Sequence, residues 1–299
     1  MQLFLQRVFD ALENGAIYSS MALALALIYK STGHLNFAQG EMAMFGAFVT
    51  YVLAVEQHWP VWLAVAAAVL VLAAFGAAVE RVLVRPLEKR NPLAVVIITL
   101  GLFLILNSVA GDVWFGPPRA YAKPFPAKTA DNAIGIGGAR LYYATLTYWA
   151  VVGGVFVLLL VLLRRTKVGL AFRSVSSNRE SAQFVGIGVG TTLMLGWALA
   201  AGVGTLAGVI KASQQGTIDN NLMLPVLIYA FAAVTLGGFD SLGGALVGGL
   251  AVAFAETMVG GYVHAIGTNL SQVSALALII VVVLFRPSGL FGSRKVERV

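Results

Sequence analysis

Nine long apolar runs, each close to the length that crosses a lipid bilayer, account for most of the chain. A membrane-spanning helix needs about 20 mostly apolar residues, and it satisfies its own backbone polar groups in lipid. Asp, Glu, Lys and Arg form only 11% of the 299 residues, whereas a soluble domain carries about 25%. We therefore expect an all-α polytopic membrane protein, a single domain over residues 1–299 with about eight to ten transmembrane helices. The runs cover residues 14–29, 35–55, 61–84, 93–114, 142–163, 191–210, 222–236, 242–261 and 266–285.

The basic residues predict which ends of these helices face the cytoplasm. If successive runs alternate in direction, 14 of the 20 Lys and Arg residues fall on one side of the membrane and six on the other. Cytoplasmic loops carry the excess of Lys and Arg in membrane proteins, so the richer side is expected to be cytoplasmic. This orientation puts the C-terminus in the cytoplasm and the N-terminus outside it.

Residues 110–141 form the longest connection on the outer side. They hold four prolines between positions 117 and 126, followed by Gly135, Gly137 and Gly138. A stretch so rich in proline and glycine cannot form a helix, and it predicts an extracytoplasmic loop with a small hairpin at Gly137 and Gly138. The loop is either a plain connector or a docking surface for a component outside the cell.

Residues 164–190 lie between the fifth and sixth runs and are too polar to span the membrane. Within them, Ser177 and Glu180 have the S-x-x-E spacing of a capping box, in which the serine caps the start of a helix. The pattern predicts a helix of about two turns that ends at Gly186, since glycine suits the positive φ just past a helix end. This cytoplasmic helix, which runs through Ala182 and Val185, either presents small and apolar side chains to a partner or rests on the protein's own loops.

Two carboxylates fall inside predicted spans. An ionised carboxylate at the bilayer centre costs about 2.5–3.5 kcal/mol, so Glu41 and Glu256 are expected to face a wet cavity or a polar partner. Asn36, Gln39 and Glu41 together break the second run, and broken helices are tolerated only where they are buried in protein or line water. The three residues either shape a translocation path or its gate, or they form a polar clamp that holds a kink.

Tyr18, Asn107 and Glu256 are further candidates for lining the path, and the alternative for each is a hydrogen bond between helices. His34 and His264 lie at the edges of spans. Neither has a second ligand at metal spacing, so no metal site is expected.

Small residues recur every fourth position in two of the runs. Such stripes allow helices to cross closely, either within one chain or between two subunits. They comprise Gly196, Ala200, Gly204 and Gly208 in the sixth run and Gly244 and Gly248 in the eighth.

Several functional classes conflict with the sequence. The net charge is +7, but no basic stripe is interleaved with aromatic residues, so nucleic-acid binding is not expected. The chain has no G-x-x-x-x-G-K-[ST] motif and cannot hold ATP in a P-loop. No nucleophile lies beside a base, so an enzyme is not expected. Two transporter classes remain: an importer subunit driven by separate ATPases, or an ion- or proton-coupled secondary carrier that uses Glu41 and Glu256.

Blocks spread along the chain favour the first class. Glu180, Ser181 and Ala182, followed after three residues by Gly186, resemble the EAA-x3-G signature of ABC importer permeases, whose cytoplasmic coupling helix inserts into a groove of the ATPase subunit. Over about residues 10–292 the chain resembles the LivH-type permease of the branched-chain (hydrophobic) amino acid uptake family. The blocks are Asn36-Phe37-Ala38-Gln39-Gly40-Glu41, Thr166-Lys167-Val168-Gly169 with Arg173, Gly186-Ile187, Leu236-Gly237-Gly238, Ser241-Leu242-Gly243-Gly244-Ala245 and residues 284–292.

This resemblance implies a type II ABC importer permease in a bacterial inner membrane, with a broken second helix beside the central pathway. It implies as partners a second homologous, LivM-type permease subunit, two cytoplasmic ATPases that use ATP and Mg, and an extracytoplasmic binding protein. The substrate would be a branched-chain or other hydrophobic amino acid, with urea and short amides as alternatives. The residues assigned to ATPase coupling are Ser177, Arg179, Glu180, Ser181, Ala182 and Gly186.

The chain departs from the family pattern at three positions. Gln39 stands where the family commonly has His, which could alter the polarity of the pathway. Ser181 replaces the second Ala of the motif and is small enough for the same packing. Asp240 stands where a small residue is usual, and it fits as the N-cap of the eighth helix.

Overall fold

The computed structural model describes residues 1–88, 92–114, 116–262, 277, 279–280, 284 and 289–292. Six of the helices in this part of the chain are long and apolar enough to cross a membrane, so the protein is an all-α polytopic membrane protein. These six are α1 (Gln2–Thr32), α3 (Val61–Val79) with its continuation to Leu87, α5 (Pro92–Val113), α6 (Tyr143–Arg165), α9 (Val189–Gln215) and α11 (Leu242–Tyr262).

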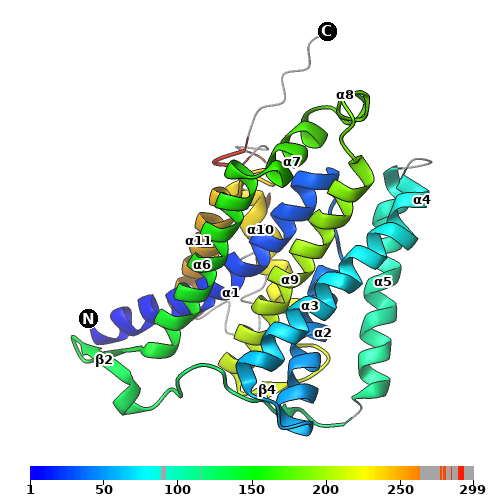
Figure 1. Cartoon of the computed structure of the whole chain (residues 1–299). Coiled ribbons are helices and arrows are strands. Elements are labelled where there is room, and N and C mark those ends of the chain that lie inside the picture. The colour runs from blue at the N-terminus through cyan, green and yellow to red at the C-terminus, as the bar shows by residue number, and fades with distance from the viewer. Residues whose placement is uncertain are drawn as a thin grey trace. The chain divides into compact units, whose positions relative to one another are not determined.

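Shorter elements connect these helices (Figure 1). They are α2 (Gln39–Tyr51) with a π-helical turn at Val52–Glu56, a second π-helical turn at Glu80–Val84, α4 (Arg85–Glu88), α7 (Lys167–Ser177), α8 (Arg179–Phe184) and α10 (Leu224–Gly237), a 3-10 turn at Ala130–Asn132, and the strands β1 (Arg119–Ala120), β2 (Ala133–Ile136), β3 (Ala139–Tyr142) and β4 (Thr217–Ile218).

Each of the first eight apolar runs corresponds to a helix, and most of the ninth run, 266–285, falls outside the described residues. The largest difference is at the start. Helix α1 begins at Gln2 rather than near residue 14. Polar side chains in its early turns find partners on the same helix, since Gln6 donates to Asp10 at 3.0 Å one turn later. The polar residues there therefore do not interrupt the helix.

The chain forms two compact units. The first comprises residues 1–26, 125–152 and 225–299, and the second comprises residues 27–124 and 153–224. In the first unit, α10 and α11 pack closely, because a Cβ added at Gly248 would overlap the carbonyl oxygen of Ala233. The start of α1 packs there too, since the Trp149 indole N–H donates to the carbonyl oxygen of Leu12 at 2.8 Å.

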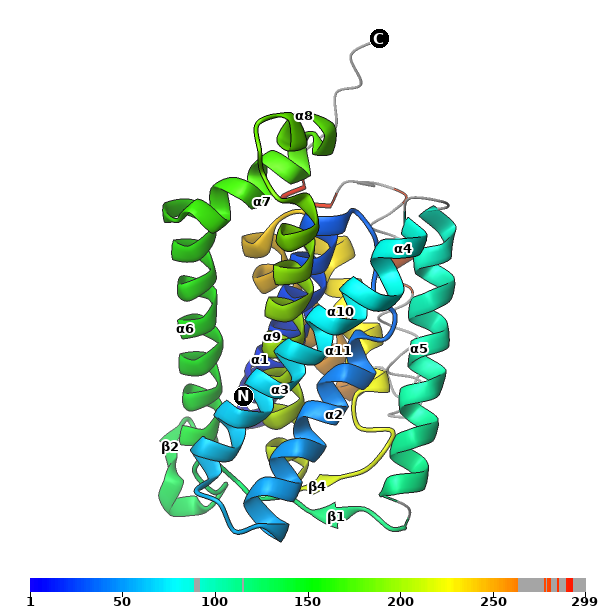
Figure 2. The same ribbon diagram turned by 45° about the vertical axis from the view of Figure 1, so that its right-hand side comes forward.

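The second unit is centred on α9, which lies beside α2 and α3 (Figures 1 and 2). The small residues of α9 face these neighbours. A Cβ added at Gly208 would overlap the carbonyl oxygen of Ala43 on α2, and one at Gly204 would lie 2.5 Å from the Gln39 amide nitrogen. The stripes of small residues in the sixth and eighth runs therefore serve crossings within this chain.

Two short antiparallel pairs complete the described structure. Strands β2 and β3 form a hairpin in the first unit, with Gly137 and Gly138 at φ of 59° and 84°. Positive φ at both central residues is the geometry of a type I′ turn, which glycine adopts without strain. The predicted hairpin in the 110–141 loop is thus confirmed. In the second unit, β1 pairs with β4 through Arg119 and Ile218.

Candidate functional site

The broken second span begins with a buried polar turn in the second unit. Asn36 lies in the non-helical segment between α1 and α2. Its side-chain Oδ1 accepts a hydrogen bond from the Ala38 backbone N–H at 3.0 Å. Its amide donates to Gln39 at 3.1 Å, and Gln39 in turn donates to the backbone carbonyl of Ala200 on α9 at 2.8 Å. Both amides are fully buried. Asn36 and Gln39 have the geometry of a clamp that fixes the start of α2 on α9.

Glu41 has different surroundings from this clamp. It is buried in the first turn of α2, where the partial positive charge of a helix N-terminus favours a carboxylate. Asn107 of α5 donates to Glu41 at 3.4 Å and to the backbone carbonyl of Asn220 at 3.1 Å. The Asn107 amide thus connects the start of α2, helix α5 and the loop before α10.

A cavity of about 280 Å³ lies in the same unit. Trp114 stacks on Phe48 in its wall, with ring centroids 4.2 Å apart. Arg119 and Asp219 bring opposite charges to the lining, and Asn220 connects it through Asn107 to Glu41. The wall therefore offers an aromatic surface together with one basic and one acidic group. Its residues are Phe48, Gly111, Trp114, Gly116, Pro117, Arg119, Ile218, Asp219 and Asn220.

Glu256 of α11 is the centre of a polar group in the first unit. Its carboxylate accepts hydrogen bonds from Asn14 and Tyr18, both at 3.4 Å, and from Tyr229 at 3.5 Å. The rings of Tyr18 and Tyr229 stack with centroids 4.6 Å apart. The six residues predicted for a path therefore form two groups: Tyr18 and Glu256 in one unit, and Asn36, Gln39, Glu41 and Asn107 in the other.

Residues 164–190 contain the predicted short helix, but its cap differs by one residue. Ser177 is the last residue of α7 and cannot act as the cap. Asn178 has the extended backbone of an N-cap, and its side chain accepts from the Ser181 N–H at 2.9 Å. Asparagine caps as well as serine does. The predicted end is confirmed, since Gly186 closes the helix at φ of 81°.

The exposed side of α8 also differs from the prediction. Ala182 is buried against Val175 of α7 and Leu193 of α9, so it is not available to a partner. The large apolar side chains that face solvent are Phe184, 90% exposed, and Val185, 74% exposed. Residue-type patterns missed Phe184, although an aromatic residue just before the glycine of a polar segment was a usable signal.

The remaining predicted coupling residues differ in exposure. Ser177, Glu180, Ser181 and Gly186 are exposed. Arg179 is half-buried and donates to the backbone carbonyl of Thr32, which is the last residue of α1. Most of the motif is therefore accessible from solvent, while Arg179 and Ala182 attach the helix to the protein itself.

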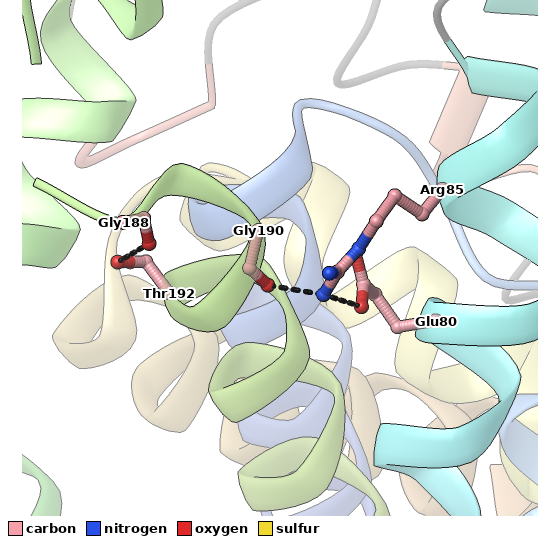
Figure 3. Close-up of polar contacts among 5 residues, drawn as sticks. All are labelled: Glu80, Arg85, Gly188, Gly190 and Thr192. Carbon is pink, nitrogen blue, oxygen red and sulfur yellow. Dashed lines mark hydrogen bonds and ion pairs between the residues drawn. The ribbon is translucent and has the colours of Figure 1, made fainter. Parts of the chain in front are cut away.

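One ion pair with a buried carboxylate in the second unit was not anticipated. Glu80, in the π-helical turn that follows α3, pairs with Arg85, and Arg85 also donates to the backbone carbonyl of Gly190 on α9 at 2.6 Å (Figure 3). Glu80 lies within the third apolar run, so the argument applied to Glu41 would have identified it. At the level of sequence, Arg85 contributes only to the count of basic residues.

The α11 helix is capped one residue later than predicted. Ser241, not Asp240, accepts the Gly244 N–H at 3.0 Å. The difference has a simple cause, because the helix starts at Leu242 and the residue directly before it takes the cap position. Among the described residues, no group of three or more His, Cys, Asp or Glu side chains could hold a metal ion.

Comparison with known proteins gives consistent matches over nearly the whole chain. A family model described as branched-chain amino acid transport system / permease component matches residues 7–283. The high-affinity branched-chain amino acid transport system permease protein BraD of Pseudomonas aeruginosa is 29% identical over 99% of this chain and 98% of its own length. The probable branched-chain amino acid transport permease protein LivH of Methanocaldococcus jannaschii is 30% identical over 94% and 91%. Among solved structures, PsaBC from Streptococcus pneumoniae in complex with Fab aligns with 93% of this chain and 91% of its own at a TM-score of 0.49 and 14% identity.

Proposed function

The chain belongs to the family of branched-chain amino acid transport system permease components, and from this premise we propose that it is the membrane subunit of an ATP-binding-cassette importer for branched-chain or other hydrophobic amino acids. The observation that carries the proposal is the extent of the family match, residues 7–283 of 299. BraD and LivH, whose names describe branched-chain amino acid transport, are similar over nearly their full lengths. Urea and short amides are the alternative substrates.

The partners follow from the importer class. Because the chain lacks a P-loop motif, ATP and Mg are bound by two cytoplasmic ATPase subunits. A second, LivM-type permease completes the membrane pair, and an extracytoplasmic binding protein delivers the substrate. The complex resides in a bacterial inner membrane, with the C-terminus of this chain in the cytoplasm and its N-terminus outside.

Each unit, taken by itself, has polar residues suited to a translocation path. In the second unit, the cavity admits the substrate and the Asn220, Asn107 and Glu41 connection leads inward from it. The opposite charges of Arg119 and Asp219 suit a zwitterion, and the aromatic wall suits its apolar side chain. In the first unit, the group around Glu256 provides polar lining. Asn36 and Gln39 hold the broken helix in place.

The coupling step uses α8. Closure of the ATPase pair moves this helix, and the membrane helices re-orient so that the path opens alternately to the two sides. Phe184 and Val185 are exposed at the end of α8, where a groove of the ATPase would cover them. Covering an exposed phenylalanine or valine side chain stabilises a complex by about 1.5–3 kcal/mol.

A secondary carrier explains fewer of these features. It would use Glu41 and Glu256 as relay groups, and nothing in the family match favours this use. It also needs no cytoplasmic partner, which leaves the exposed apolar end of α8 without a role.

Replacement of Phe184 tests the proposed docking. We expect Phe184→Glu to abolish co-purification of the ATPase subunits, because a carboxylate in an apolar groove is desolvated without a partner. Phe184→Leu should retain them. The control Ser176→Glu adds the same charge to exposed α7 and should also retain them. If the ATPases remain bound to Phe184→Glu, α8 is not the docking helix.

A further inference from the structure

Glu80 lies in a π-helical turn of the second unit, and this geometry fixes its partner. In a π-helical turn the backbone hydrogen bond joins residues five apart, and the Arg85 N–H accordingly donates to the carbonyl oxygen of Glu80. The same spacing brings the two side chains together, with Arg85 Nε 3.0 Å and Nη2 2.6 Å from the two carboxylate oxygens. Arg85 thus binds the fully buried Glu80 carboxylate in a bidentate manner.

Arg85 makes one further bond, and this bond reaches another helix. Its Nη2 donates to the backbone carbonyl of Gly190 at 2.6 Å, in the first turn of α9 (Figure 3). A Cβ at position 190 would lie 2.8 Å from the guanidinium carbon, so a larger residue there would require the Arg85 side chain to shift. Gly188, which caps the same turn, accepts a hydrogen bond from the Thr192 hydroxyl at 3.1 Å. Arg85, the first residue of α4 in the continuation of α3, therefore binds the first turn of α9.

That turn of α9 directly follows the coupling segment. Ile187 and Val189, on either side of the α9 cap, pack against the cluster formed by Val175, Ala182 and Leu193. Helices α7 and α8 both contact α9. Displacement of α8 is therefore transmitted through this cluster to the turn at Gly190.

From the same turn the connection continues to the helices of the path. The Glu80–Val84 turn follows α3 without a break, and α3 packs against α9 and α2. Helix α2 carries Glu41 in its first turn. Coupling between distant sites travels through such packed elements when both ends bias the same arrangement.

Stability alone is a weak reason for this arrangement. A buried ion pair can often be replaced by apolar residues without loss of stability, because desolvation of the charges offsets their attraction. Charged residues inside membrane spans are costly, and π-helical turns are frequent at functional sites. The desolvation cost of the Glu80–Arg85 pair is explained if the pair fixes the position of the Gly190 turn rather than only filling space.

We propose that Glu80 and Arg85 are positioning residues that transmit movement of the coupling helix α8 to α3 by holding the Gly190 turn of α9. The proposal rests on the proposed importer function. Loss of the hydrogen bond between Arg85 and Gly190 should leave the ATPases bound and active. ATP hydrolysis should then no longer be coupled to transport.

The test uses the complete importer in proteoliposomes and measures ATP hydrolysed per substrate molecule taken up. We expect Arg85→Gln and Glu80→Gln to raise this ratio about tenfold while the ATPases still co-purify. The control Arg81→Gln removes an exposed charge from the same π-helical turn and should change the ratio by less than about twofold.

A second pair of variants keeps every charge in place. Gly190→Ala displaces Arg85 from the α9 carbonyl and should raise the ratio, whereas Gly188→Ala, whose added Cβ meets no atom closer than 3.4 Å, should not.

If the parent complex shows no ATP-driven uptake, the proposed function itself fails. If the parent is coupled and Gly190→Ala, Arg85→Gln and Glu80→Gln keep the parental ratio, the positioning role is overturned. Should Arg85→Gln fail to assemble, the Gly190→Ala result decides.

Discussion

At the scale of single residues, the buried carboxylates have distinct environments. Glu80 is bound by an arginine on both oxygens, whereas Glu41 has an amide donor at 3.4 Å and the start of a helix. A carboxylate without a cationic partner retains a stronger field toward a passing ligand. We therefore propose that Glu41, like Asp219 in the cavity wall, interacts with the ammonium group of an amino acid.

Replacement of Glu41 by glutamine separates charge from packing. Glutamine keeps the size and the contact with Asn107 but loses the negative charge. We expect the initial rate of ATP-driven uptake to fall about tenfold, since a hydrogen bond to a charged group contributes about 1.5–3 kcal/mol. The measurement is radiolabelled uptake into proteoliposomes. Asp131→Asn, which removes an exposed charge from the 3-10 turn at Ala130–Asn132, is the control. An unchanged rate for Glu41→Gln would mean that this residue only packs.

At the scale of elements, the lengths of the apolar runs predicted the helices correctly. Residue patterns, in contrast, placed the N-caps of α8 and α11 one residue too early. Apolar runs located eight helices because lipid imposes a length requirement that the sequence must meet. The α8 cap was predicted one residue early, since nothing in the local pattern shows that α7 extends through Ser177. The partner of Asn107 was equally hidden, because it depends on how α5 packs beside α2. Spacing along one helix start linked Asn36, Gln39 and Glu41 but could not distinguish a clamp from a path.

The crossing of α9 and α2 gives a prediction at the same scale. Gly208→Ala should destabilise the protein by about 1–3 kcal/mol or more, because its methyl group overlaps the α2 backbone and overpacking costs that much. The measurement is thermal unfolding in detergent. Gly202→Ala on the same helix meets no atom closer than Val69 Cγ1 at 3.3 Å and should cost less. Equal melting temperatures for the two variants would contradict the close crossing.

At the scale of the whole molecule, the few charged residues of the sequence belong to separate structural groups. The chain is a multi-pass membrane protein of the branched-chain amino acid permease family. The first unit contains a polar group around Glu256, and the second unit contains one around Glu41 and another at Glu80 and Arg85. Residues 164–190, in the second unit, include the exposed apolar end of α8 and reach Gly190, whose carbonyl oxygen accepts a hydrogen bond from Arg85, the partner of Glu80. These features together fit an importer subunit whose energy source is a separate protein.

The energy source of transport is the most direct test of that conclusion. The chain would be reconstituted in liposomes with its partner permease, the two ATPases and the binding protein, and the initial rate of leucine uptake would be measured with and without ATP. We predict accumulation of leucine that requires both ATP and the ATPase subunits. Uptake by this chain alone, driven by an ion or proton gradient without ATP, would contradict the importer assignment.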